Sequence, residues 1–181
     1  MGMLSYDMLF LHENCRVVYK QDYLYTVSGV SDLPVSQIRN LLAETCTCER
    51  IGEGEHSFDE WVFDNCISIL VYQKDGWFQG FFLKGCFAYF DKGVEQCYAC
   101  YKRWSKTIPL QIYVMNQAVQ PTTGSELRDM VGEAYKEIIE LFRRQYGDIE
   151  WKVSNERAFH REVRRRQSLW YRLSRYFHRK K

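Results

Sequence analysis

A two-residue turn, Asp75-Gly76, lies between two apolar runs in this 181-residue chain, and no other feature constrains its fold as strongly. The first run covers residues 66–73 and the second covers residues 77–83, so each has the length of a β-strand. An Asp-Gly pair between two such runs is a strong signal of a tight hairpin. The sequence therefore predicts a central β-hairpin over about residues 66–90.

The register of this hairpin follows from its turn. With two residues in the turn, Leu70 is expected opposite Phe81. Glycine inside a strand often marks a bulge or a close approach of another backbone. Gly80 and Gly85 are the two candidates for such a position.

The segments around the hairpin predict a mixture of strands and helices. Residues 16–27 and 109–115 are rich in β-branched and aromatic side chains, which is typical of strands. Apolar residues spaced three and four apart predict helices over residues 32–45, 93–105 and 123–147. This order favours an α+β fold, with a mostly antiparallel sheet and helices packed on one face.

Charge divides the chain into two parts. Residues 156–181 contain eight Arg and two Lys against two Glu, a net charge of +8. Since the whole chain carries +2, residues 1–155 sum to −6. We therefore expect one net acidic α+β domain over residues 1–155. A basic amphipathic helix over residues 156–181 would be packed on this domain or appended to it.

Arginine covers most of the expected last helix and leaves one aromatic seam. Guanidinium groups bind phosphate and carboxylate through two hydrogen bonds, so this composition points to anion recognition. The target would be nucleic acid, an anionic membrane surface or an acidic protein face. The alternative is a solvated helix whose arginines pair with residues 49–64 of its own domain. The candidate binding residues are Arg157, Arg161, Arg164, Arg165, Arg166, Trp170, Arg172 and Arg175.

Residues 49–64 form an acidic stretch, and its first half is expected to be a loop. Such a face could dock a basic partner by electrostatic complementarity. A solvated loop would explain the same charges without any partner. The candidate residues of this acidic face are Glu53, Glu55, Asp59, Glu60 and Asp64.

The seven cysteines predict reduced thiols, because their number is odd and the chain is not small. Cys46 with Cys48, and Cys97 with Cys100, make an alternative set of four zinc ligands. No cofactor is expected, since the chain has no phosphate-binding loop and no dinucleotide fingerprint. With no recognisable secretory signal and no apolar run near ~20 residues, we expect a cytoplasmic protein.

Three classes of function are compatible with these features. We favour a non-enzymatic module that binds another protein, as inhibitors, adaptors and immunity proteins do, because aromatic residues are frequent and no catalytic constellation is visible. The alternative is a protein that binds nucleic acid or an anionic membrane surface through residues 156–181. An enzyme would require a site assembled only in space, for example from Cys48, His56 and Asp59. Self-association through the aromatic seam would also be compatible.

Overall fold

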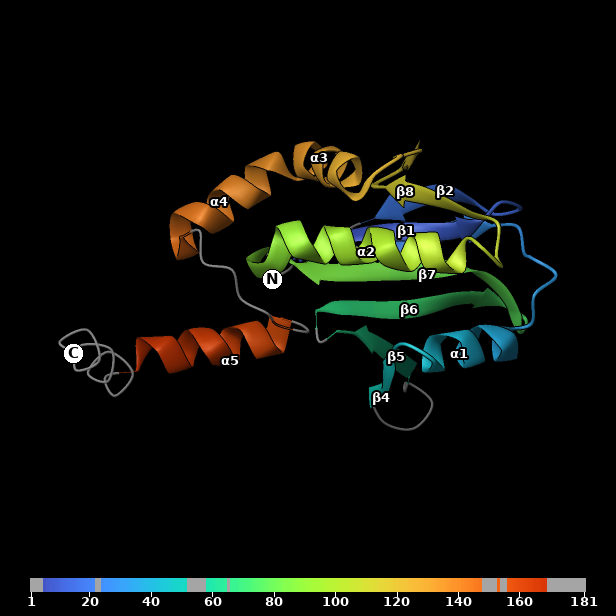
Figure 1. Ribbon diagram of the computed structural model, residues 1–181, viewed down its shortest axis with the longest axis horizontal. Coiled ribbons are helices and arrows are strands. Elements are labelled where there is room, and N and C mark those ends of the chain that lie inside the picture. Colours follow the sequence, from blue (N-terminus) through green and yellow to red (C-terminus); the bar gives the residue numbers. More distant parts are fainter. Residues whose placement is uncertain are drawn as a thin grey trace.

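A seven-stranded sheet forms the centre of the computed structural model, which describes residues 5–21, 24–51, 58–64, 66–147, 153 and 156–168. The predicted α+β fold is confirmed, and every strand pairing in the described residues is antiparallel (Figure 1). In order across the sheet, the strands are β4 (Thr47–Ile51), β5 (Phe58–Phe63), β6 (Ile67–Lys74), β7 (Trp77–Cys86), β1 (Ser5–His12), β8 (Leu110–Val114) and β9 (Gln117–Val119). A separate hairpin joins β2 (Arg16–Gln21) to β3 (Leu24–Ser28).

The predicted central hairpin is confirmed as β6 and β7. Asp75 and Gly76 adopt φ values of 53° and 84°, as a tight hairpin turn of this kind requires. The predicted register is wrong by one residue, because Leu70 pairs with Phe82. A bulge, expected near Gly80, causes the shift.

The residue that the bulge inserts into β7 is Gln79. Tyr72 pairs with Gly80 and Gln73 pairs with Phe78, so Gln79 has no opposite residue. Its side chain is buried and donates to the carbonyl oxygen of Gly29 over 2.6 Å. The bulge therefore directs one amide side chain onto the segment that follows β3.

The far end of the hairpin was also predicted incorrectly, because β7 ends at Cys86 and not near residue 90. Residues Phe87–Tyr89 form a single 3-10 turn, and the next helix already begins at Phe90. The early start of this helix brings Phe87 and Phe90 beside Tyr6, with ring centroids 5.7 and 5.2 Å from the Tyr6 ring.

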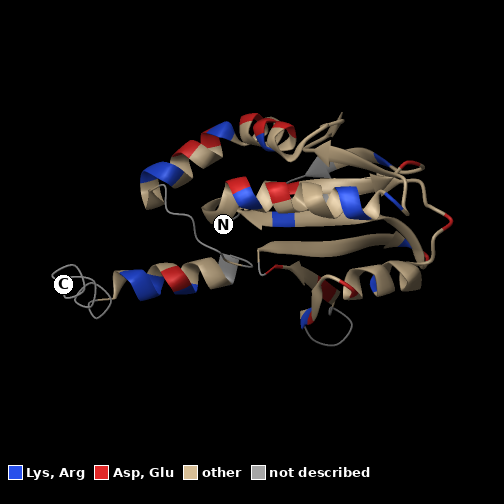
Figure 2. Ribbon diagram, in the orientation of Figure 1, with Lys and Arg blue, Asp and Glu red and all other residues tan. Residues whose placement is uncertain are grey.

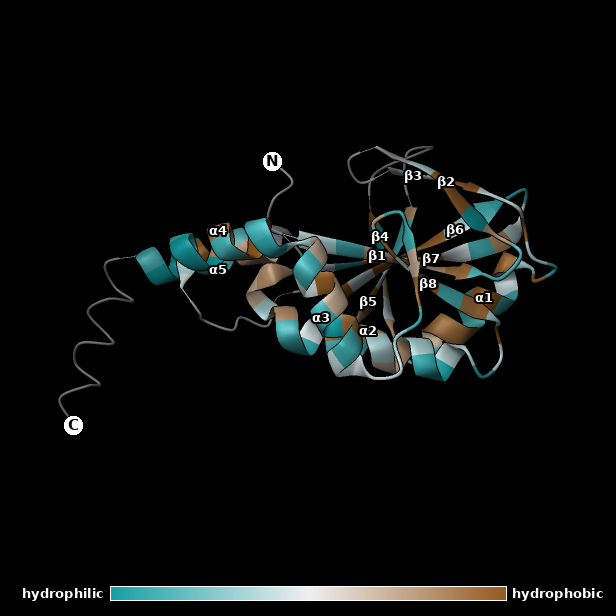
Figure 3. Cartoon of the chain, turned by 90° about the horizontal axis from the view of Figure 1, so that it is seen from above, coloured by the Kyte–Doolittle hydropathy of each residue, from teal (hydrophilic) through white to brown (hydrophobic). Residues whose placement is uncertain are grey.

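The helices of the described residues contribute to one core on a single face of the sheet, as the sequence predicts, although the last of them joins this core only near its start and then extends away (Figure 1). They are α1 (Val35–Ala43), α2 (Phe90–Trp104), α3 (Gly124–Ala134), α4 (Lys136–Tyr146) and α5 (Glu156–Gln167). Their apolar side chains join Met8 and Phe10 of β1 in the main core. Seen from above, many of the hydrophobic residues lie on the strands at the centre of the molecule (Figure 3).

The opposite face of the sheet is covered in part by the β2–β3 hairpin. Tyr25 packs there with Leu9, Leu11 and Phe82 in a second, smaller core. The Tyr25 hydroxyl also donates to the buried carboxylate of Asp7. This hydrogen bond gives one oxygen of the buried Asp7 carboxyl a partner, which reduces the cost of burying the group.

Two further expectations were wrong in detail. The helix predicted over residues 123–147 is broken at Tyr135, whose backbone leaves helical geometry and whose hydroxyl hydrogen bonds to the backbone of Asp7. The acidic stretch was expected to begin as a loop, but its start belongs to strand β4, which pairs along β5.

Among the described residues, no helix is long and apolar enough to span a membrane.

Candidate functional site

The ladder between β5 and β6 is interrupted after three residue pairs, and a pocket of about 510 Å³ lies where the two strands separate. The last pair joins Trp61 to Ile69. Beyond it, β6 continues to Lys74 with no described strand on the side away from β7. Figure 1 shows β4 and β5 diverging from β6 at this point, next to α1. We call this hollow the β5–β6 groove.

The walls of the groove come from three elements that are fixed elsewhere. The start of β5 is held by β4 over five consecutive pairs. Helix α1 is tied to the hairpin turn, because the Val35 amide donates to the Gly76 carbonyl oxygen over 3.0 Å. The Phe78 amide likewise donates to the carbonyl oxygen of Leu33 over 2.9 Å. The groove is therefore a preformed feature of the sheet edge.

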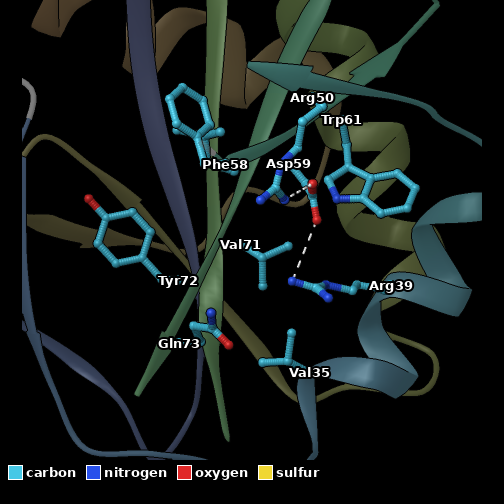
Figure 4. Close-up of a pocket in the computed structure, with 10 residues that line it drawn as sticks. Val35, Arg39, Arg50, Phe58, Asp59, Trp61, Val71, Tyr72 and Gln73 are labelled. Carbon is cyan, nitrogen blue, oxygen red and sulfur yellow. Dashed lines mark hydrogen bonds and ion pairs between the residues drawn. The ribbon is translucent and has the colours of Figure 1, made fainter. Parts of the chain in front are cut away.

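Two arginines converge on one carboxylate in the groove (Figure 4). Arg50 of β4 contacts Asp59 over 2.6 Å, and Arg39 of α1 contacts the second carboxylate oxygen over 3.5 Å. The Arg39 and Arg50 side chains remain 51% and 61% exposed, whereas Asp59 is 22% exposed. Through these two ion pairs, Asp59 of β5 links the groove wall to both α1 and β4.

Aromatic and aliphatic side chains line the remainder of the groove. Alternation along the strands places Trp61 and Val71 on the helix-covered face, where Trp61 is buried. Phe58 and Tyr72 point to the opposite face, and Phe58 is 46% exposed. Figure 4 shows these side chains on both sides of the open ladder, with Gln73 at one end. This surface offers apolar contacts next to charged ones.

The acidic face predicted from the sequence is not one surface in the structure. Asp59 lies in the groove, whereas Glu60 points to the opposite sheet face and accepts a hydrogen bond from Ser68. Asp64 lies in the turn after β5 and accepts a hydrogen bond from Gln96. Glu53 and Glu55 lie outside the described residues. Period-two alternation along β5 separates these neighbouring carboxylates.

The four cysteines of the alternative zinc site are not gathered. Cys97 and Cys100 are buried in α2, whereas Cys48 is exposed on β4. Within the described ranges, no group of three or more candidate ligands could hold a metal ion. Burial raises the pKa of Cys97 and raises that of Cys100 to about 12, so both are neutral thiols at physiological pH. All seven cysteines are free.

Part of the hypothetical catalytic set can be located. Cys48 interacts electrostatically with Asp59, Arg39 and Arg50, so its thiol lies near the groove. Burial, followed by the Asp59 carboxylate, raises the pKa of Cys48 and disfavours the reactive thiolate. His56 lies outside the described residues. The located groups therefore do not make an activated nucleophile.

The basic helix is anchored at its start and extends away from the sheet (Figure 1). Phe159 is completely buried against Phe142 and Tyr146, with ring centroids 5.5 and 5.1 Å apart. Beyond this anchor, basic residues follow along the helix (Figure 2). The side chain of Arg157 and the residues Trp170, Arg172 and Arg175 lie outside what the structure describes.

The arginines of α5 differ in their surroundings. Arg165 and Arg166 hydrogen bond to Glu162 of the same helix, and they lower the pKa of Glu162 to about 2. Arg161 and Arg164 are exposed, and no hydrogen bond or ion pair joins them to another described side chain. For Arg161 and Arg164, the predicted alternative of pairing with residues 49–64 is not seen within the described part of the chain. Asp59 is held instead by Arg39 and Arg50.

Sequence reasoning missed the groove as a site. It identified Asp59 as a charged residue, but it did not identify Arg39 or Tyr72. The three residues lie on separate elements, and no spacing in the sequence links them. The available signal was Phe58-Asp-Glu-Trp61, in which aromatic residues flank acidic ones within a strand.

Comparisons with protein families, with curated proteins and with solved structures give no match to this chain.

Proposed function

We propose that this chain is a non-enzymatic, cytosolic protein-binding module, of inhibitor, immunity or adaptor type, that docks a partner in the β5–β6 groove. The observation that carries the proposal is the groove itself, an open hollow of about 510 Å³ lined by aromatic and arginine side chains. Aromatic and arginine residues supply most of the binding energy in protein interfaces. A cytosolic location is supported by the seven free thiols.

The composition of the groove supports binding more than catalysis. Its charged groups, Arg39, Arg50 and Asp59, pair with one another, and no described histidine lines it. General acid–base chemistry needs a titratable group placed against a reacting atom. Docking needs only a preformed surface with complementary contacts.

Photocrosslinking from position 58 tests this proposal. We expect a photoreactive benzoyl-phenylalanine that replaces Phe58 to crosslink one discrete partner in extracts of the native host. The same group in place of Leu141, which is 49% exposed on α4, should give no such product. A self-crosslinked product would identify a second copy of the chain as the partner. Equal labelling from both positions, or none from position 58, would contradict a docking site in the groove.

A second candidate function is favoured by the position of α5. The helix carries Arg161 and Arg164 on exposed positions beyond its Phe159 anchor. Residues 156–181 have a net charge of +8, which suits binding of a nucleic acid strand or an anionic membrane surface. This candidate uses a different surface from the groove, so the two can be tested separately.

The salt dependence of nucleic acid binding tests the second candidate. Each phosphate contact with a single strand contributes about 0.7 to the slope of log affinity against log salt concentration. The double variant Arg161→Gln and Arg164→Gln should therefore reduce this slope by about 1.4, measured by fluorescence anisotropy with a labelled oligonucleotide. The matched change of Lys102→Gln and Arg103→Gln on α2 should leave it unaltered. If the two variants give the same slope of log affinity against log salt concentration, α5 is not the binding element.

A further inference from the structure

We propose that β4, at the edge of the seven-stranded sheet, takes up a further strand from a basic partner protein, and that an Arg of this strand binds Glu49 and Glu60. This inference concerns a second surface and goes beyond the docking proposed for the β5–β6 groove. It is carried by the exposure of β4, by its register on β5 and by the two carboxylates that this register places together.

Strand β4 is an uncovered edge of the sheet. It pairs with β5 over five consecutive residues and is the outermost strand on its side, at the lower border of the sheet in Figure 1. Its first four residues, 47–50, are exposed, and Ile51 is half-buried. An edge strand of an antiparallel pair directs half of its backbone N–H and C=O groups away from the sheet. Peptides that add to such an edge use these groups for affinity.

The register of β4 on β5 places two carboxylates directly opposite each other. Glu49 pairs with Glu60, on the sheet face away from the helices. Like charges at such a position are unfavourable. The hydrogen bond from Ser68 to Glu60 is the one polar contact that the described part of the chain gives to this pair of side chains. The pair therefore presents negative charge that no described base balances through an ion pair.

The other charged residues near the edge are kept apart from this pair. Arg50 and Asp59 alternate with it along the strands, so they lie on the helix-covered face. Lys84 lies on β7, two strands away from Glu60. Residues 52–57, which are not described, contain two Glu and no Lys or Arg. A positively charged side chain is thus the complementary ligand for this part of the edge.

A second copy of β4 would suit the edge poorly. Two-fold antiparallel pairing of Thr47–Ile51 with itself is centred on Glu49, so it would bring each Glu49 opposite its counterpart. A strand with a basic central residue would meet the same edge with opposite charge. Arg fits better than Lys, because the five N–H donors of a guanidinium can serve the carboxylates of Glu49 and Glu60 together.

Titration with a defined peptide tests the inference on the intact chain. The probe is acetyl-Val-Thr-Arg-Thr-Val-amide, whose central Arg would face Glu49 while the two Val side chains face Thr47 and Ile51. We expect amide chemical-shift changes concentrated in residues 47–51, with little change in β9, the strand at the opposite edge. Citrulline in place of Arg keeps the shape and removes the charge. This neutral peptide should bind about tenfold more weakly, as expected for loss of one charge-assisted hydrogen-bonded pair.

A double-mutant cycle assigns the guanidinium to its partner. Glu49→Gln should weaken binding of the Arg peptide about tenfold and leave that of the citrulline peptide nearly unaltered. The variant should fold, because Glu49 is exposed and its opposite residue carries a like charge. Glu133→Gln is the matched control, since Glu133 lies on α3 with its side chain 79% exposed. It should bind both peptides like the parent protein.

Equal affinity for the two peptides, or the absence of shift changes in residues 47–51, would overturn the inference. The two carboxylates would then serve only to keep other strands away from the edge. Shift changes confined to residues 70–74 would place the peptide in the groove and would overturn it as well. The proposed function is judged by the crosslink from position 58, which uses no peptide, so the two experiments fail separately.

Discussion

Replacing Gly80 with alanine should destabilise the protein by about 3 kcal/mol or more, one of the two largest effects that we expect from a single substitution. A Cβ atom at this position would lie 2.6 Å from the Phe10 carbonyl oxygen and 3.0 Å from the Leu11 Cα. Both are backbone atoms of the central strand β1, which is fully buried and paired on both sides. Neither can move without disrupting the sheet. The decrease in the free energy of unfolding is measured by urea unfolding followed by circular dichroism.

Gly132→Ala is the matched control for this substitution. Gly132 lies in helix α3, and its added Cβ would meet nothing closer than 3.8 Å, in the ring of Phe90. Alanine loses less backbone entropy than glycine on folding, so this variant should be about 0.5–1 kcal/mol more stable. If the free energy of unfolding of Gly80→Ala stays within about 1 kcal/mol of that of the parent protein, the close approach of β7 to β1 at this position is contradicted.

Phe159→Ala should release α5 from the domain at a cost of about 3–5 kcal/mol. The Phe159 ring is completely buried and contacts Phe142 and Tyr146, so its removal leaves a cavity at the helix anchor. We expect the cost to appear as local opening of α5 while the sheet stays folded. Tryptic cleavage after the arginines of α5 should then accelerate on the order of 100-fold, as about 3 kcal/mol of opening free energy implies.

Arg161→Ala provides the comparison, because it changes an exposed side chain on the same helix. Its effect on stability should stay within about 0.5 kcal/mol. Equal cleavage rates in the Phe159→Ala and Arg161→Ala variants would mean that Phe159 does not anchor the helix. If the Phe159→Ala variant still binds nucleic acid, that binding depends on the charge of α5 and not on its position on the domain.

Local chemistry in the sequence was sufficient to predict the central hairpin. Asp75-Gly76 favours a tight turn wherever two apolar runs flank it, and the structure contains that turn. The register could not be predicted, because the bulge depends on the Gln79 side chain reaching Gly29 on a distant segment. A contact across 50 residues leaves no periodic signal in either segment.

The central strand β1 was missed for a related reason. All eight residues of Ser5–His12 are buried, since β7 and β8 flank the strand and both sheet faces are covered there. Such strands lack the polar–apolar alternation that identifies half-buried ones. Asp7 interrupts the apolar run, and its buried carboxyl accepts a hydrogen bond from Tyr25, a tertiary contact that the sequence does not reveal.

The candidate site was predicted least well. Asp59 was identified as part of an acidic face, but strand alternation sends Glu60 to the opposite side of the sheet. The partners of Asp59 are Arg39 and Arg50, which precede it by 20 and 9 residues on separate elements. Pairing of β4 with β5, and the position of α1 at the hairpin turn, bring them together.

The docking account is tested most directly by amide hydrogen exchange. Exchange is measured on the chain alone and on its complex with the partner that crosslinks at position 58. We expect slower exchange on complex formation in residues 58–61 and 70–74, where the open strand edges lie. Residues of α3 and α4 should exchange at the same rate in both states. Unchanged exchange along β5 and β6, with protection elsewhere, would contradict the account.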